Sequence, residues 1–140
     1  MARDAGRDGP RLIKTDGVAA PSGPWNVAAR AGDFLFIAGM RGIDPATNKL
    51  VAGDKSRIRQ AFENMASVAR TEGATLDDCV RLVVYVTDMA RHRPLVNEVQ
   101  ETLWKTGHHP PRTIVEVSAL PRGDTIQIEG TLYVLKHQTL

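Results

Sequence analysis

The residues of this sequence that could do chemistry lie on two predicted strands near its C-terminal end. Arg112 opens the strand predicted over residues 112–118, and Glu129 lies within the strand predicted over residues 125–135. Alternate side chains of a strand point to the same face, so each strand sets one charged group among apolar neighbours. Arg112 also follows Pro110-Pro111, which force extended backbone and restrict where its guanidinium can point.

This pair of charged residues has two interpretations. The simpler one is structural, because an arginine and a glutamate on neighbouring strands can form a cross-strand ion pair on a solvated face. The other is that the two side chains belong to a functional site. The alternation of residues alone does not decide between them.

Other kinds of site find little support in the sequence. His108 and His109 are adjacent, and neither His92 nor His137 lies at a recognised ligand spacing from them, so we expect no metal site. There is no Ser/His/Asp nucleophile motif, no G-x-G-x-x-G and no phosphate-binding loop. The sequence therefore gives no reason to expect a bound cofactor.

The composition predicts one cytoplasmic domain. The chain has 140 residues, 42% of them hydrophobic, and a net charge of +2 with basic and acidic residues interleaved, which argues against nucleic acid as the main partner. The lone Cys79 cannot form an intrachain disulfide and is expected to be a buried, inert core residue in a reducing compartment. No apolar stretch is long enough to span a membrane.

The start of the chain differs from the rest. Residues 1–10 combine charged residues and glycines without an apolar stretch, so they are not a secretory signal. We predict that they form a disordered tail, and that residues 11–140 form the domain.

The pattern of apolar residues predicts an α+β fold with a six-stranded mixed sheet and two helices on one face. Apolar residues recur every three or four positions over residues 54–72, and Asp88 can cap a second helix over residues 90–106. The run Phe34–Ala38 is apolar throughout, which indicates a strand buried on both faces, and Gly39 then suggests a bulge or a close backbone contact. The other predicted strands cover residues 11–15, 25–31, 79–87, 112–118 and 125–135.

The segment PPRTIVEVSALPRGDTIQIEGTLYV, residues 110–134, resembles the C-terminal signature of the RidA/YjgF family. That signature runs Pro-x-Arg-Ser/Thr-x-Val-Glu-Val, then Leu-Pro, then a strand ending in Ile-Glu. The resemblance covers about residues 11–136. Further stretches agree with the family in order and spacing, namely Gly23-Pro24-Trp25, Ile37-Ala38-Gly39, Glu63-Asn64-Met65 and Val83–Thr87.

The resemblance implies a chorismate-mutase-like fold and a homotrimer with clefts between its subunits. It also implies hydrolysis, without a cofactor, of 2-aminoacrylate-like enamine or imine acids to 2-keto acids and ammonia. In the family an arginine at the position of Arg112 grips the substrate carboxylate, and a glutamate at the position of Glu129 positions water. The further substrate-binding residues that it implies are Gly39, Ile114, Trp25 and Asn97.

Three departures from the family pattern indicate a more apolar pocket. Ile114 stands where the family often has cysteine, Ala38 where it has serine, and Trp25 where it often has tyrosine. A larger and more apolar enamine acid than 2-aminoacrylate is therefore a reasonable substrate. Two alternatives remain open, a small-carboxylate-binding or chaperone-like module on the same fold, and an endoribonuclease.

Overall fold

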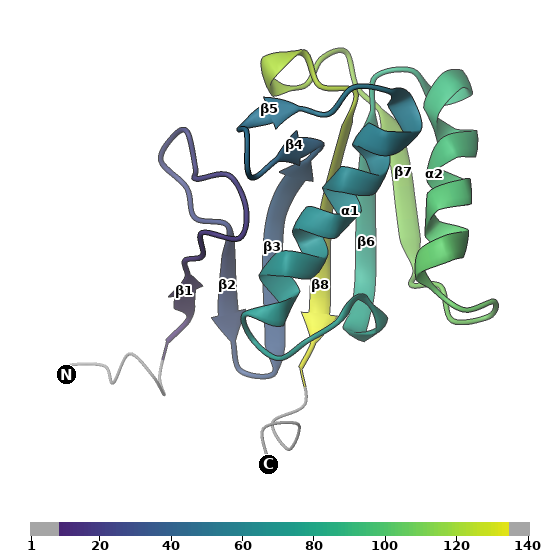
Figure 1. The fold of residues 1–140 in the computed structure, drawn as a ribbon. Helices are drawn as coiled ribbons and strands as arrows, with labels where there is room; N and C mark the ends of the chain where they lie inside the picture. Colours follow the sequence, from purple (N-terminus) through teal and green to yellow (C-terminus); the bar gives the residue numbers. More distant parts are fainter. Residues whose placement is uncertain (1–8, 135–140) are drawn as a thin grey trace.

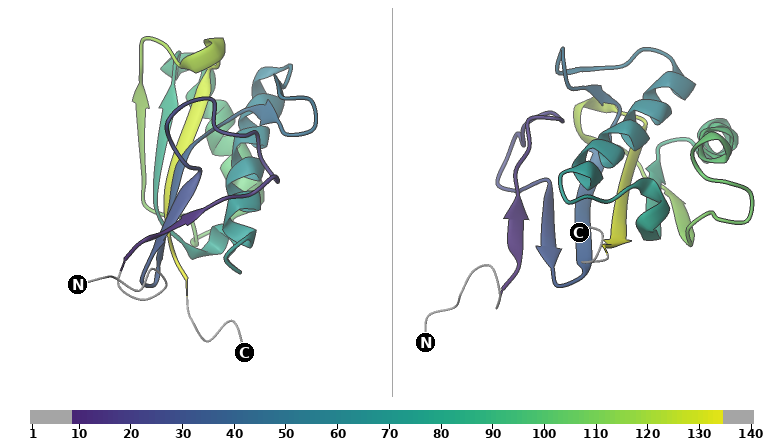
Figure 2. Two further views of the ribbon diagram at one scale, coloured as in Figure 1. Left: turned by 90° about the vertical axis from the view of Figure 1, so that its left-hand side faces the viewer. Right: turned by 60° about the horizontal axis from the view of Figure 1, so that its bottom comes forward.

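The computed structural model describes residues 9–134, in which six strands form one mixed sheet. The strand order is β1-β2-β3-β8-β6-β7, and only the β6–β7 pair is parallel. Both helices pack on one face, as the edge-on view shows (Figures 1 and 2), so the predicted arrangement is confirmed. The strands of the sheet are β1 (Arg11–Ile13), β2 (Ala28–Ala31), β3 (Phe34–Arg41), β6 (Cys79–Val86), β7 (Arg112–Glu116) and β8 (Ile126–Tyr133).

The first helix, α1 (Asp54–Arg70), begins where the sequence predicts and ends two residues earlier. Its apolar stripe, which includes the fully buried Ile58 and Phe62, packs over β3 and β8. Gly73 follows in the left-handed region at φ 72°, where a glycine avoids the steric cost of a side chain.

The second helix, α2 (Met89–Leu103), lies beside β6 and β7. The carboxylate of Asp88 accepts a hydrogen bond from the backbone N–H of Arg91 at 3.1 Å, which confirms the predicted cap. The helix ends earlier than predicted because Trp104 leaves it in an extended conformation. The indole is buried and donates to the carbonyl of Leu76 at 2.9 Å, so Trp104 belongs to the core.

The predicted burial of Cys79 is confirmed. Burial raises the pKa of its thiol to about 11, although weak hydrogen bonding to backbone opposes the shift. The residue is thus a protonated core side chain at neutral pH, which suits an inert role.

The prediction for β3 was wrong in one respect. Phe34 and Phe36 are 41% and 47% exposed, whereas Leu35 and Ile37 are buried. The helices cover only one face of the sheet, so the alternate aromatic residues lie on the uncovered face. We call this the open face, and its exposed apolar residues are Leu12, Phe34, Phe36, Val115 and Tyr133.

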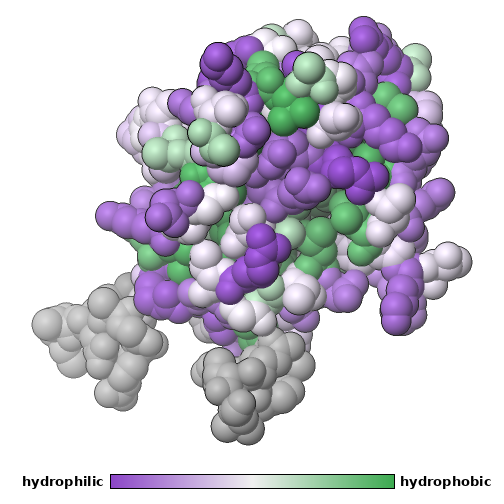
Figure 3. All heavy atoms as spheres, viewed as in Figure 1, coloured by the Kyte–Doolittle hydropathy of each residue, from purple (hydrophilic) through white to green (hydrophobic). Residues whose placement is uncertain are grey.

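The opposite, helix-covered side of the molecule shows a mainly polar surface (Figure 3). A small hairpin of β4 (Ile43–Asp44) and β5 (Lys49–Leu50) extends from the end of β3. No helix among residues 9–134 is long and apolar enough to cross a membrane. The disordered tail predicted for residues 1–10 lies almost wholly outside the described residues.

Candidate active site

Arg112 begins β7, the edge strand of the sheet, and its side chain points toward α2. One guanidinium nitrogen, Nη1, donates to Asn97 Oδ1 at 2.7 Å and to Gln100 Oε1 at 2.8 Å. The preceding Pro111 is held to β6, because its carbonyl accepts from the backbone N–H of Leu82 at 2.9 Å. The rigid diproline and the two amides therefore fix the position of the guanidinium.

The charge of Arg112 has no acidic counterpart within ion-pair distance among the described residues. Burial is the main cause that lowers its pKa, and the nearby Arg93 adds to the effect. An arginine stays protonated even so, so a half-buried positive charge is held by neutral amides alone. Its Nε and Nη2 have no hydrogen-bond partner in residues 9–134, and they remain available to a carboxylate.

Glu129 lies on the open face of the sheet, away from Arg112. Its Oε1 accepts a hydrogen bond from the Tyr85 hydroxyl at 2.5 Å, and this bond is the main cause that raises the pKa of Tyr85. In the register of the sheet, Glu129 is paired with Val83, whereas Arg112 is paired with Leu82. Paired residues share a face and successive residues alternate, so Glu129 and Arg112 point to opposite faces.

This geometry rules out the cross-strand ion pair as an interpretation of the two residues. The strand β6 lies between β7 and β8, so Arg112 and Glu129 are not on neighbouring strands at all. Nor does one protomer bring them into one site. Ile114 shares the helix-side face with Arg112 and packs against the core, and Asn97 contacts the guanidinium.

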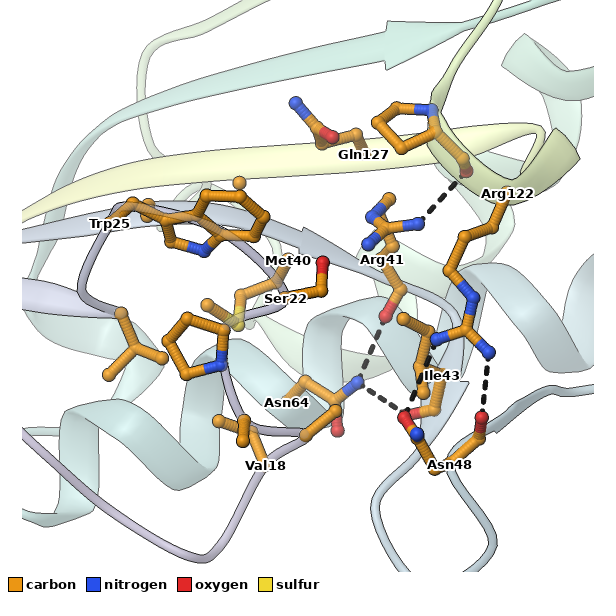
Figure 4. Close-up of a pocket in the computed structure, with 17 residues that line it drawn as sticks. Val18, Ser22, Trp25, Met40, Arg41, Ile43, Asn48, Asn64, Arg122 and Gln127 are labelled. Carbon is orange, nitrogen blue, oxygen red and sulfur yellow. Dashed lines mark hydrogen bonds between the residues drawn. The ribbon is translucent and has the colours of Figure 1, made fainter.

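A cavity of about 310 Å³ lies where the β1–β2 loop meets β3 and β8, several strands away from β7 in the sheet (Figure 4). Of the predicted substrate-binding residues, it contains Trp25 and Gly39. Three further strand spacings separate β3 from β7, which amounts to about 14 Å across the sheet. The other residues that shape the cavity include Val18, Met40, Arg41, Ile43, Arg122 and Gln127.

Two glycines let side chains close over the backbone at this cavity. A Cβ on Gly23 would lie 2.3 Å from the indole of Trp25, so the ring can rest there only because the residue is glycine. A Cβ on Gly39 would lie 2.6 Å from the side-chain amide of Gln127. The close contact predicted at Gly39 is thus confirmed, and its partner is Gln127.

The predicted bulge at Gly39 is confirmed as well. The pairing of β3 with β8 shifts register between Ile37 and Met40. An extra residue in one strand redirects the side chains that follow it. After the bulge, Arg41 pairs with Gln127, and both side chains reach the cavity.

The sequence patterns did not point to Arg41, Arg122 or Gln127. Gln127 precedes Glu129 by two residues, so strand alternation already placed the two on one face. Arg41 follows the bulge, and Arg122 lies in a turn with φ 62°, so neither position could be assigned from periodicity. The described residues contain no cluster of three potential metal ligands.

Fold and site together define a small α+β protein with a cavity of about 310 Å³ and, apart from it, a half-buried arginine on an edge strand. The family described as Endoribonuclease L-PSP matches residues 17–134. With the C-terminal motif and the relatives below, this match shows that the chain belongs to the RidA/YjgF family.

Similar proteins carry several different names. A RutC family protein of Pyrococcus horikoshii is 39% identical over 87% of this chain and 96% of its own. A 2-iminobutanoate/2-iminopropanoate deaminase of Mus musculus is 31% identical over 86% of this chain and 88% of its own. The solved structure of a probable translation initiation inhibitor from Rhodopseudomonas palustris is 50% identical, with a TM-score of 0.86, 90% of this chain covered and 98% of that one. The expected fold is therefore confirmed.

Proposed function

We propose that this protein hydrolyses enamine or imine forms of 2-amino acids to 2-keto acids and ammonia. The observation that carries the proposal is the guanidinium of Arg112, half-buried, oriented by Asn97 and Gln100, and without a carboxylate partner among the described residues. Such a group binds a carboxylate through two parallel hydrogen bonds, which orient the substrate as well as attract it. The name of the mouse relative, an imine deaminase, supports the same reaction.

The active site in this proposal is shared between subunits of a homotrimer. Arg112 and the cavity at Gly39 are too far apart to act on one small molecule within a protomer. A second copy that covers the open face would bring the cavity of one subunit toward the β7 edge of its neighbour. The exposed aromatic residues of that face, Phe34, Phe36 and Tyr133, support such an interface.

The reaction needs little more than positioning. Water adds to the imine carbon, the resulting carbinolamine releases ammonia, and a keto group remains. In our proposal Arg112 holds the carboxylate, the backbone at Gly39 and the amide of Gln127 hold the reacting group, and Glu129 with Tyr85 relays the proton. Holding reactants in the right geometry can supply much of the acceleration of such an addition.

An assay with freshly generated 2-iminobutanoate tests this function. An amino-acid oxidase produces the imine in the presence of catalase, and semicarbazide traps what has not been hydrolysed. We expect the protein to lower the trapped fraction in proportion to its concentration. If the trapped fraction stays unchanged at micromolar protein, the deaminase assignment fails and a carboxylate-binding or chaperone-like module is favoured.

The name of the matching family raises endoribonuclease activity as a second candidate. Incubating RNA with the wild-type protein and with the Arg112→Ala variant distinguishes this activity from imine hydrolysis. Cleavage by the variant, in a preparation free of contaminating nuclease, would require a site other than that of Arg112. A cytoplasmic location is also part of the proposal, and the single buried cysteine is compatible with it.

A further inference from the structure

The cavity at Gly39 is positively charged. Two arginines, Arg41 and Arg122, contribute to its lining, and no aspartate or glutamate does so among the described residues (Figure 4). The remaining walls are largely apolar, with Val18, Met40 and Trp25. The cavity therefore pairs apolar surface with uncompensated positive charge.

Within residues 9–134, neither arginine forms an ion pair. The Nη1 of Arg41 donates to the carbonyl of Pro121 at 2.9 Å, and the Nη2 of Arg122 donates to the carbonyl of Asn48 at 2.7 Å. Burial is the main cause that lowers the pKa of Arg41, Asp124 opposes it, and the like charge of Arg122 adds to it. Carbonyl oxygens satisfy donors but carry no net charge.

The acidic residue that acts electrostatically on Arg41 is Asp124, and its carboxylate already has other partners. Asp124 is buried and accepts from the backbone N–H groups of Gly42 at 3.0 Å and Thr125 at 2.7 Å. Its ion pair is with Arg57, at 4.0 Å, and not with Arg41. The carboxylate is thus hydrogen-bonded to the backbone, and it does not line the cavity.

The positions of the two arginines are built into the fold. Arg122 and Asn48 both have positive φ, 62° and 58°, and the hydrogen bonds between them join the turn before β8 to the β4–β5 hairpin. Non-glycine residues in this region cost energy, and such strain is concentrated at functional sites. Gln127 completes the group with a neutral amide, which can donate to an anion without adding negative charge.

We propose that the substrate side chain ends in a second carboxylate, which binds between Arg41 and Arg122 while Arg112 of a neighbouring subunit holds the first. This inference rests on the proposed function and names its substrate class, the imines of acidic amino acids. Hydrolysis adds one water to the C=N bond and yields a 2-oxo diacid and ammonia. Any reaction that supplies the substrate must either oxidise the Cα–N bond of an acidic amino acid to the imine, or eliminate a leaving group from the β-carbon of a β-substituted one together with the α-proton.

Competing substrates test the inference. Oxidases that act on glutamate and on 2-aminobutanoate supply 2-iminoglutarate and 2-iminobutanoate, and the trapped fraction gives kcat/KM for each. We expect a preference of tenfold or more for 2-iminoglutarate, the scale of a hydrogen-bonded charge pair. Arg41→Gln and Arg122→Gln should each reduce this preference several-fold. Arg59→Gln, which removes the same charge from α1 outside the cavity, should preserve it.

Direct binding measurements test the diacid ligand class separately from the deaminase activity. Calorimetry with the stable products 2-oxoglutarate and 2-oxobutanoate needs no turnover, and we expect tenfold tighter binding of the diacid, lost in Arg41→Gln. Turnover of both imines without preference, and equal binding of both products, would overturn the diacid inference and leave the deaminase standing. No turnover together with Arg41-dependent binding of 2-oxoglutarate would overturn the deaminase and keep the ligand class. Melting temperatures of the variants verify that they are folded.

Discussion

At the scale of single residues, Arg112 is the group on which the proposed chemistry depends. The amides of Asn97 and Gln100 accept hydrogen bonds from its Nη1, which leaves Nε and Nη2 to bind a carboxylate through two hydrogen bonds. A lysine ammonium cannot reproduce this two-point contact. We therefore expect Arg112→Lys to lose nearly as much activity as Arg112→Ala. The alanine variant should lose on the order of 2–4 kcal/mol of transition-state stabilisation, measured as kcat/KM on 2-iminobutanoate.

A matched control keeps this prediction specific. Arg59→Lys makes the same change on α1, where the guanidinium contacts only the Thr102 hydroxyl among the described residues. It should leave kcat/KM within twofold. If Arg112→Ala mainly lowers thermal stability while the folded fraction hydrolyses the imine at the wild-type rate, Arg112 is a structural residue and its assignment is wrong.

Strand β8 carries two candidate functional residues, Glu129 as a proton relay and Gln127 as a contact for the reacting group. Gln127 lies against Gly39 in the cavity, whereas Glu129 bonds Tyr85 on the open face. If Glu129 relays the proton, Glu129→Gln should lower kcat by roughly 10²–10⁴-fold with a smaller change in KM. Tyr85→Phe removes the partner and should reproduce part of the loss. A Glu129→Gln enzyme with unchanged kcat would leave Gln127 and the backbone as the reacting-group contacts.

Cys79 gives the stability of the protein a defined pH dependence. Its folded pKa of about 11 lies above the ordinary value near 9, so between these values the folded protein keeps a proton that the unfolded chain loses. Rising pH then favours unfolding, and the contribution present below pH 9 is lost by pH 11. The difference in unfolding free energy between wild type and Cys79→Ala should therefore shrink by roughly 2 kcal/mol over this range.

Chemical denaturation of both proteins at several pH values measures this difference. Lysines and tyrosines that titrate in the same range are common to both proteins and cancel. A difference that stays constant from pH 8 to pH 11 would contradict the protonated, buried thiol.

At the scale of elements, α1 fixes the end of β3 that carries Arg41. The buried Asn64 of α1 donates to the carbonyls of Arg41 at 2.9 Å and Ile43 at 2.8 Å. Between them, Gly42 lies so close to the helix that a Cβ would be 2.6 Å from the carbonyl oxygen of Arg57. The helix and the strand can make this contact only because residue 42 is glycine.

Gly42→Ala should therefore destabilise the protein and disturb the cavity. Backbone atoms cannot move aside as cheaply as a side-chain end, and we expect a loss of about 1–3 kcal/mol, the usual cost of overpacking. Gly17→Ala is a suitable control, since its Cβ would meet nothing closer than the Thr15 hydroxyl at 3.3 Å. Equal midpoints of urea unfolding for the two variants would contradict the close approach of β3 and α1.

The limits of sequence reasoning also lie at the level of elements. Local patterns predicted α1 with its stripe, the strand β6 and, from the glycine that interrupts an apolar run, the bulge at Gly39. They could not predict that β6 lies between β8 and β7. That order, together with the register that pairs Arg112 with Leu82 and Glu129 with Val83, decides that Arg112 and Glu129 face opposite ways. The apolar run of β3 was read as buried on both faces, since the run itself does not reveal that both helices cover the same side.

The full set of residues that line the cavity could not be predicted from the sequence either. Gly39 and Trp25 were predicted from a resemblance, but Arg41, Arg122 and Gln127 come together only when the β1–β2 loop, the end of β3 and the turn before β8 meet. Contacts between such distant segments leave no periodic signal in the sequence.

At the scale of the whole molecule, the protomer is unequally covered. The helix side is mainly polar (Figure 3), whereas the open face exposes Phe34 and Phe36 beside Tyr133, with Phe34 and Tyr133 rings 5.5 Å apart. A contiguous exposed apolar patch is typical of an association surface. The active site proposed above, divided between the β7 edge and the cavity at Gly39, leads to the same expectation, because its two parts would meet only across subunits.

We therefore expect light scattering at micromolar concentration to give three times the 15.3 kDa mass of the chain. Phe36→Asp places a charge on the open face and should shift the protein toward the monomer, because an unpaired charge buried in an interface is costly. Ser56→Asp adds the same charge at an exposed position of α1 and should remain trimeric. Phe36 borders Glu129, so activity is compared in Phe34→Asp, which changes the open face away from Glu129 and the cavity at Gly39. Loss of imine hydrolysis together with the trimer in that variant would mean that the site is shared. A wild-type monomer with full activity would contradict the shared site, because one protomer points Arg112 and Glu129 to opposite faces of its sheet.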